Sequence, residues 1–124
     1  MPRTTKSEAP IAVDNDQMTG RYVELGPYTV AFETFPQDAD ATEIFAGLPD
    51  GRCQCPHWGT VVAGQIVFRY ADRSETFRAG DTYYGAPGHV PLVFAGTEVV
   101  EFSPTDKLNE TMAVVTATMQ SMGV

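Results

Sequence analysis

The fold class of this chain follows from TVVAGQIVFRY, residues 60–70, in which two β-rich runs flank Gly64. Branched and aromatic side chains on both sides of a glycine are typical of two short strands joined by a turn. Similar runs, separated by Gly, Asp or Pro, lie on either side of this stretch at intervals of roughly ten residues. They cover residues 22–25, 28–35, 53–57, 74–77, 82–84, 91–94 and 98–102. This spacing predicts an antiparallel β-sandwich or barrel.

The two ends of the chain differ from this β-rich part. Residues 1–20 are polar and aperiodic, so we expect a flexible N-terminal arm there and a barrel over residues 21–103. At the other end, Ser103 offers an N-cap and Pro104 a first helical residue. Residues 104–124 are predicted to form an amphipathic helix that packs on the barrel or on a second subunit. Its apolar stripe would consist of Leu108, Met112, Val115 and Met119.

Composition excludes several classes of partner. The 124 residues carry a net charge of −8, and the eight basic residues are scattered. Because binding to nucleic acid needs clustered Lys and Arg, we expect no nucleic-acid partner. No apolar run approaches the ~20 residues that span a bilayer, and no signal-peptide pattern is present, so we expect no membrane span. A cytoplasmic location with reduced thiols follows as the default.

Both cysteines and both histidines fall between residues 53 and 89. Cys53, Cys55 and His57 stand at i, i+2 and i+4, positions that share one face of a strand. His89 follows a Pro-Gly turn in a later segment. If the two segments are neighbours, two thiolates and two imidazoles converge on one interior point. That donor set suits tetrahedral Zn²⁺.

Each of these four residues also has an ordinary structural explanation. Free cysteines are usually small, inert, buried side chains. His57 could be a core histidine bonded to a carbonyl, and His89 a turn residue. Four protein ligands would make a closed structural zinc site, whereas the loss of one thiolate would leave a position open for chemistry. These interpretations stay open at the level of sequence.

Several further side chains are candidates for a role in the interior. Tyr83 and Tyr84 point to opposite faces of a strand, so one of them lines the interior. Glu33 and Glu101 lie within apolar strands, where a solvated outer face is the simpler expectation. An inward carboxylate would serve as a general base. We take Tyr83, Tyr84 and Glu101 as the proton-transfer candidates, and expect Trp58 in the core or on the outer face.

The order of these segments resembles a cupin, a small jelly-roll or double-stranded β-helix barrel. Residues 61–68 match the strand, glycine turn and strand that close the family's first motif. Residues 80–84, followed by the Pro-Gly turn at 87–88, match its second motif. The ligand pattern matches less well. Counting from Gly64 places His57 at the family's glutamate and Cys53 at its second histidine, while His89 lies two residues before the family's last histidine.

This resemblance implies an all-β, cupin-like double-stranded β-helix with a C-terminal amphipathic helix, present as a homodimer. It also implies a pocket for a small organic molecule, organised by a divalent transition metal. Zinc is favoured, with iron, manganese or nickel as alternatives. The metal ligands would come from Cys53, Cys55, His57 and His89.

Cupin chemistry includes metal-dependent oxygenation, isomerisation, decarboxylation and lyase reactions, and the fold does not select among them. Two interpretations from other classes remain. A metal-free binding or sensing module is favoured by Gly51, Ala86 and Pro91, which stand where the family pattern has a histidine, a proline and a histidine. A purely structural zinc domain is the other.

Overall fold

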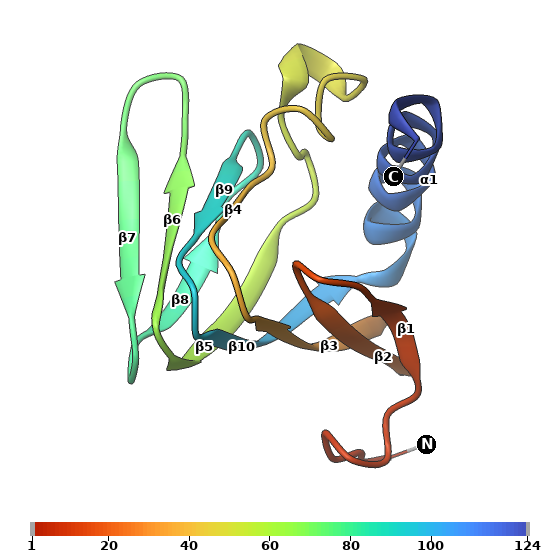
Figure 1. Ribbon diagram of the computed structural model, residues 1–124. Coiled ribbons are helices and arrows are strands. Elements are labelled where there is room, and N and C mark those ends of the chain that lie inside the picture. Colours follow the sequence, from red (N-terminus) through yellow and green to blue (C-terminus); the bar gives the residue numbers. More distant parts are fainter. Residues whose placement is uncertain (1, 124) are drawn as a thin grey trace.

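The computed structural model describes residues 2–123, which form ten strands, one short 3-10 turn and one helix (Figure 1). Met1 and Val124, the outermost residues of the expected arm and helix, lie outside the described residues. The turn η1 (Pro49–Gly51) precedes β5, and α1 (Thr105–Met122) follows β10. The strands are β1 (Ile11–Asp14), β2 (Thr19–Leu25), β3 (Tyr28–Phe35), β4 (Ala39–Asp40), β5 (His57–Ala63), β6 (Gln65–Arg69), β7 (Ser74–Arg78), β8 (Thr82–Gly85), β9 (Val90–Val93) and β10 (Thr97–Pro104).

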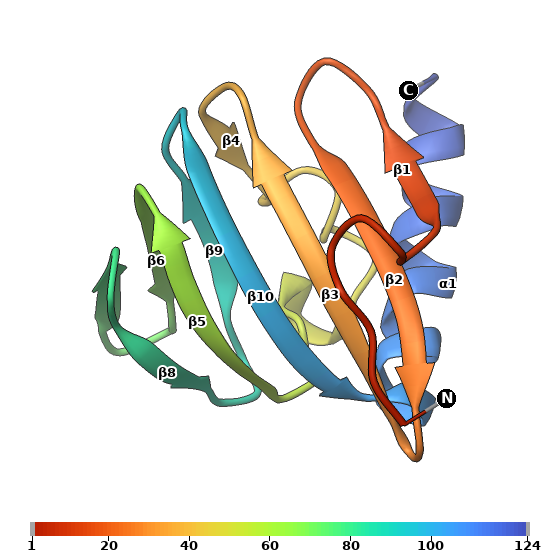
Figure 2. The same ribbon diagram turned by 90° about the horizontal axis from the view of Figure 1, so that it is seen from below.

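The strands form two antiparallel sheets. One has six strands in the order β1-β2-β3-β10-β5-β8, and the other has four in the order β4-β9-β6-β7. Figure 2 shows the six strands side by side, with β10 between β3 and β5. Strands that are neighbours in each sheet are therefore mostly distant in sequence, as the predicted jelly-roll barrel requires.

The turn at Gly64 carries the chain from one sheet to the other. β5 belongs to the six-stranded sheet and β6 to the four-stranded sheet, so residues 60–70 connect the two layers at this point. Gly64 has a positive φ of 79°, and a Cβ there would lie 2.6 Å from the Thr97 Cα. Only glycine combines this backbone conformation with so close an approach.

Two apolar clusters stabilise this arrangement. The first lies between the sheets and consists of Val61, Ile66, Phe68, Tyr83, Val93 and Val99. The second lies where α1 meets the barrel; it joins Cys53 and Cys55 to Leu48 and Val115, and Leu108 and Met119 pack against it. The predicted helix is thus confirmed, although its N-cap is Pro104 rather than Ser103. Ser103 still belongs to β10, where its hydroxyl contacts His57.

Part of the expected N-terminal arm takes part in the sheet, namely β1 and the start of β2. β1 pairs with β2, which begins at Thr19, two residues before the expected start of the barrel at 21. Ahead of β1, the amides of Glu8 and Ala9 both donate to the Thr5 carbonyl. The short apolar run that forms β1 gave no clear alternation in the sequence.

Among the described residues no helix is both long enough and apolar enough to cross a membrane.

Candidate metal centre

Three of the four candidate ligands meet inside the molecule. Cys53, His57 and His89 are all buried, and one ligand atom from each lies within 4.8 Å of the others. Cys53 and His89 face each other in an isolated β-bridge, in which the Cys53 amide donates to the His89 carbonyl at 2.9 Å. His57 is the first residue of β5. The convergence predicted from the sequence is therefore present for these three side chains.

Both imidazoles are oriented through Nδ1. Nδ1 of His89 lies 2.7 Å from the Ala86 carbonyl, which can only accept, so Nδ1 donates and Nε2 keeps its lone pair. Nδ1 of His57 lies 2.6 Å from Ser103 Oγ and 3.4 Å from a Glu101 carboxylate oxygen. A carbonyl or carboxylate beside the nitrogen that faces away from the ion is the usual environment of a metal-bound histidine.

The spacing of the donors suits zinc. The Cys53 Sγ lies 3.7 Å from Nε2 of His57. A tetrahedral ion with Zn–S of about 2.3 Å and Zn–N of about 2.05 Å separates sulfur and nitrogen by about 3.6 Å. The two imidazole ring centres are 5.0 Å apart. These side chains would need little rearrangement to share one ion.

Cys55 is not part of this group. Its thiol donates to the Pro56 carbonyl at 3.4 Å and packs under α1 in the second apolar cluster. The expectation that Cys53, Cys55 and His57 share one face assumed a regular strand. The run at 53–57 is not one, since β5 begins only at His57. Pro56 lacks an N–H and interrupts the ladder here.

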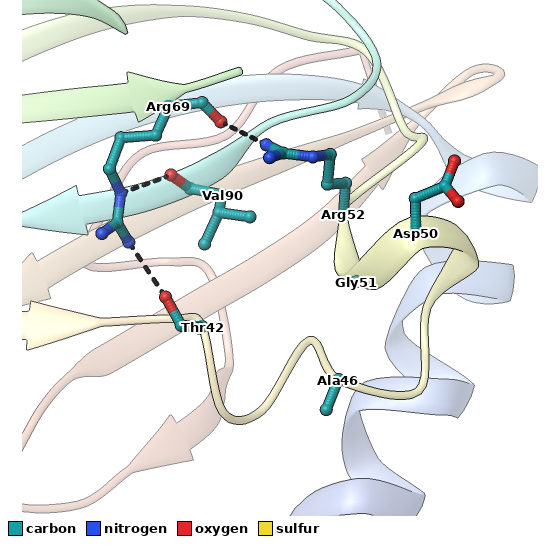
Figure 3. Close-up of a pocket in the computed structure, with 7 residues that line it drawn as sticks. All are labelled: Thr42, Ala46, Asp50, Gly51, Arg52, Arg69 and Val90. Atoms are coloured by element: carbon teal, nitrogen blue, oxygen red, sulfur yellow. Dashed lines mark hydrogen bonds between the residues drawn. The ribbon is translucent and has the colours of Figure 1, made fainter. Parts of the chain in front are cut away.

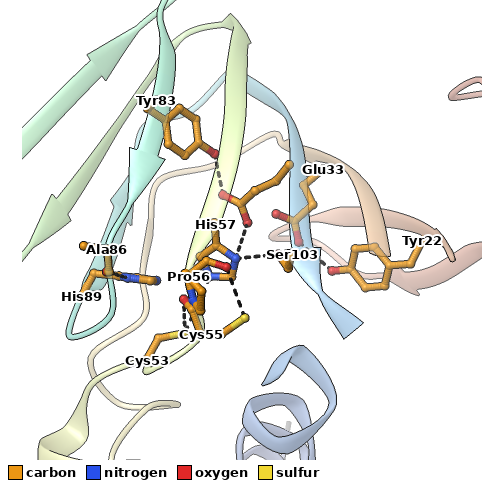
Figure 4. A network of polar contacts seen from close by, with 11 residues as sticks. Tyr22, Glu33, Cys53, Cys55, Pro56, His57, Tyr83, Ala86, His89 and Ser103 are labelled. Atoms are coloured by element: carbon orange, nitrogen blue, oxygen red, sulfur yellow. Dashed lines mark hydrogen bonds and ion pairs between the residues drawn. The ribbon is translucent and has the colours of Figure 1, made fainter. Parts of the chain in front are cut away.

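A buried carboxylate, that of Glu101, lies 3.4 Å from Nδ1 of His57 and belongs to a polar network whose other members are labelled in Figure 4. Glu101 faces the interior rather than solvent, which corrects the simpler expectation from the sequence. One of its oxygens accepts a 2.5 Å hydrogen bond from the Tyr83 hydroxyl, and the other faces His57. The second glutamate, Glu33, is half-buried and accepts a 2.6 Å hydrogen bond from the hydroxyl of Tyr22.

Strand register and two glycines explain this polar interior. Glu101 pairs with Gly59, which pairs in turn with Tyr83 on β8. A Cβ at Gly59 would lie 2.6 Å from the Tyr83 ring, so the glycine makes room for this side chain. Gly20 does the same beside Tyr22, whose hydroxyl a Cβ would approach to 2.8 Å. Sequence reasoning missed Tyr22 and Ser103, although glycines in strands often mark such close approaches.

The two adjacent tyrosines lie on opposite faces, as expected. Tyr83 is 4% exposed, whereas Tyr84 is 50% exposed and its ring lies 5.2 Å from that of Trp58 on the outer surface. Tyr84 therefore does not face the cluster and is no longer a proton-transfer candidate. Tyr83 and Glu101 remain.

Burial shifts every titratable group of the site toward its neutral form. It lowers the pKa of both His57 and His89 to about 4 and raises that of the Cys53 thiol to about 11. Burial also raises the pKa of Glu101 to about 7. The same holds for the pKa of Glu33, which the neighbouring Glu101 charge raises further. Near neutral pH the imidazoles are uncharged and ready to coordinate, while the thiol still carries its proton.

Comparisons with known proteins agree with this architecture. No protein-family model matches the sequence, and no curated protein matches it. Among solved structures, an RmlC-like cupin from Shewanella frigidimarina is similar with a TM-score of 0.54 at 13% identity, over 82% of this chain and 88% of its own. KdgF from Halomonas sp. gives 0.55 at 15% identity, over 81% and 90%. The polyketide cyclase RemF from Streptomyces resistomycificus gives 0.56 at 12% identity, over 84% and 79%. At such identities the likeness concerns the fold alone: this chain has a cupin-like fold.

Proposed function

We propose that Cys53, His57 and His89 hold a divalent transition metal, with zinc the best fit, and that this centre organises an interior site for a small organic molecule. The observation that carries the proposal is the orientation of the imidazoles. Each has its Nδ1 engaged by an oxygen, which leaves Nε2 for a metal. The thiol of Cys53 supplies a soft third donor that favours zinc over harder ions.

Three protein ligands leave one coordination position open, the arrangement that catalytic zinc sites share. A metal bound here would act as a Lewis acid that polarises a substrate oxygen. Glu101 would move the proton, because its pKa of about 7 lets it both accept and donate near neutral pH. Tyr83 holds one Glu101 oxygen in place, and the other lies 3.4 Å from Nδ1 of His57. An isomerase- or lyase-type reaction fits these parts, whereas an oxygenase-type reaction would need a redox-active ion such as iron in place of zinc. The fold is shared with a polyketide cyclase.

A metal-free binding or sensing module is the second candidate. It is favoured by the completeness of the hydrogen bonding: within residues 2–123, every fully buried side-chain nitrogen or oxygen has a partner without any ion. A closed structural zinc site is less favoured, since it needs Cys55 as a fourth ligand and that thiol contacts the Pro56 carbonyl. The homodimer and the cytoplasmic location expected from the sequence remain predictions.

The two cysteines provide a matched pair of variants to test the metal. Both are buried and lie two residues apart, but only Cys53 belongs to the cluster. We expect untagged wild-type protein to bind about one zinc per chain, Cys55→Ser to retain it and Cys53→Ser or His57→Ala to lose it. Elemental analysis after zinc loading and desalting measures this. A cobalt-loaded sample adds a thiolate charge-transfer band that Cys53→Ser should abolish and Cys55→Ser should preserve.

Equal metal retention in the two cysteine variants would contradict the assignment of Cys53. Loss of metal from both would indicate a closed site with two sulfur ligands. If the wild-type protein binds neither zinc nor cobalt, the metal proposal is wrong and the metal-free binding module is favoured.

A further inference from the structure

A hollow on the surface of the four-stranded sheet holds a second, separate group of functional side chains (Figure 3). It is open to solvent and has a volume of about 420 Å³. The loop from Thr42 to Arg52 forms one wall, and Arg69 on β6 and Val90 on β9 form the other. Cys53, His57 and His89 do not line it, although the hollow adjoins the candidate metal centre, since Arg52 precedes Cys53 and Val90 follows His89.

Arg52 brings a positive charge that no carboxylate in residues 2–123 neutralises. Its Nη1 donates to the carbonyls of Arg69, at 3.1 Å, and of Gly88, at 3.4 Å. Nε and Nη2 have no hydrogen-bond partner in the described chain, and since no buried polar atom there lacks one, both nitrogens reach solvent. The two carbonyls thus hold the guanidinium in place while one edge of its fork stays free.

The other arginine of the hollow is already satisfied. Arg69 makes a two-point ion pair with Asp40, at 2.5 and 3.2 Å, and donates through Nε to the Val90 carbonyl. Asp50 also lines the hollow, but its carboxylate points away from Arg52 in Figure 3 and the two form no ion pair. The free donor edge of this hollow therefore belongs to Arg52.

We propose that this hollow is an oxyanion-binding site, which takes the carboxylate or phosphate group of a small molecule on the free edge of Arg52. A guanidinium edge matches two oxygens of either group in a bidentate, charge-assisted contact. Because backbone carbonyls already hold the side chain, little rotamer freedom is lost on binding. Asp50 limits the affinity through like-charge repulsion.

Inorganic phosphate and acetate are the probes, titrated into ¹⁵N-labelled protein at constant ionic strength with sodium chloride as the balance. We expect saturable shifts of the Gly51, Arg52 and Gly88 amides. Arg52→Gln should weaken binding at least about tenfold, the effect of losing a charged contact. Arg78→Gln is the matched control, because Arg78 is exposed and also lies outside every ion pair formed by residues 2–123.

Asp50→Asn keeps the test decisive even if Arg52→Gln disturbs the loop. Asp50 has a positive φ of 57°, a conformation that asparagine accepts. Removing its charge should tighten anion binding severalfold and leave the contacts of Arg52 intact. The proposal is overturned if neither anion gives saturable shifts at these amides, if Arg78→Gln weakens binding as much as Arg52→Gln, or if Asp50→Asn has no effect on affinity.

Discussion

Replacing Glu33 by glutamine should make the protein more stable at neutral pH while leaving its stability in acid almost unchanged. Burial, aided by the Glu101 charge, raises the pKa of Glu33 from its ordinary 4.5 to about 7. Below 4.5 the carboxyl is protonated in both the folded and the unfolded chain. Between 4.5 and 7 the unfolded chain releases the proton first, so the free energy of unfolding falls as pH rises. Above pH 7 this loss of unfolding free energy is complete.

The size of this effect follows from the shift of the pKa. At about 1.4 kcal/mol for each tenfold change in the acid constant, the rise of the pKa from 4.5 to about 7 corresponds to about 3 kcal/mol as an upper value. Glutamine still accepts the Tyr22 hydroxyl but has no proton to lose. Glu101 contributes a decline of the same kind, so Glu33→Gln should remove only part of the total pH dependence.

Urea unfolding at several values between about pH 4 and pH 8 measures this directly, with Glu24→Gln as the control for an exposed glutamate on a neighbouring strand. The curves of wild type and Glu33→Gln should coincide near pH 4 and separate toward pH 8, with the variant more stable. Parallel curves, or a variant that is less stable at pH 8, would refute the reasoning about the raised pKa of this carboxyl.

Three further outcomes are expected. Zinc affinity should rise at least about tenfold per pH unit between about pH 6 and 8, because the Cys53 thiol releases one proton on binding and the imidazoles, with pKa values of about 4, release none. A competition titration with a chelator measures this slope. A zinc affinity that does not change with pH would exclude Cys53 as a ligand. Tyr83→Phe should destabilise the fold by about 1–3 kcal/mol in urea unfolding, since it removes the hydrogen-bond donor to the buried Glu101. The same change at the exposed Tyr84 should destabilise it by less than about 0.5 kcal/mol. Similar values for both variants would contradict the inward role of Tyr83. Gly59→Ala should lower stability by about 1–3 kcal/mol through its clash with the Tyr83 ring, and a neutral effect would show that the ring can move aside.

Much of the fold could be predicted because its strands and its helix show local patterns. The β-rich runs on both sides of Gly64, the punctuation by glycine and proline and the helical stripe from Leu108 onward each depend on neighbours in the sequence. The strands, turns and helix that these patterns predict are present in the structure, and they make up the two sheets and the closing helix. Strand β1 was missed because a strand of four residues, Ile11–Asp14, shows too short a pattern to be told from a polar loop.

The site was predictable only to the level of residue type. Spacing identified Cys53, His57 and His89, but the positions of their side chains depend on pairings across the sheets. The exclusion of Cys55 depends on the break in the strand before His57, which periodicity overlooks. The inward orientation of Glu101 depends on its register with Gly59 and Tyr83, and no local signal in an apolar strand distinguishes an inward carboxylate from an outward one.

The ionisable groups of the candidate centre can balance the charge of a divalent ion at a buried site. In the family pattern a glutamate stands where this chain has His57. Here a carboxylate comes instead from β10, the neighbour of β5 in the six-stranded sheet: a Glu101 oxygen lies 3.4 Å from Nδ1 of His57. Without an ion, neutrality requires both the thiol of Cys53 and the carboxyl of Glu101 to be protonated, and the raised pKa of each agrees with this. With a divalent ion, one thiolate and one carboxylate balance its two positive charges. The protonated and the metal-bound forms are thus both electrically neutral, so the interior avoids an unpaired charge in either state. Exchange between them requires that the Cys53 proton leave as the ion enters, together with the Glu101 proton below its pKa of about 7.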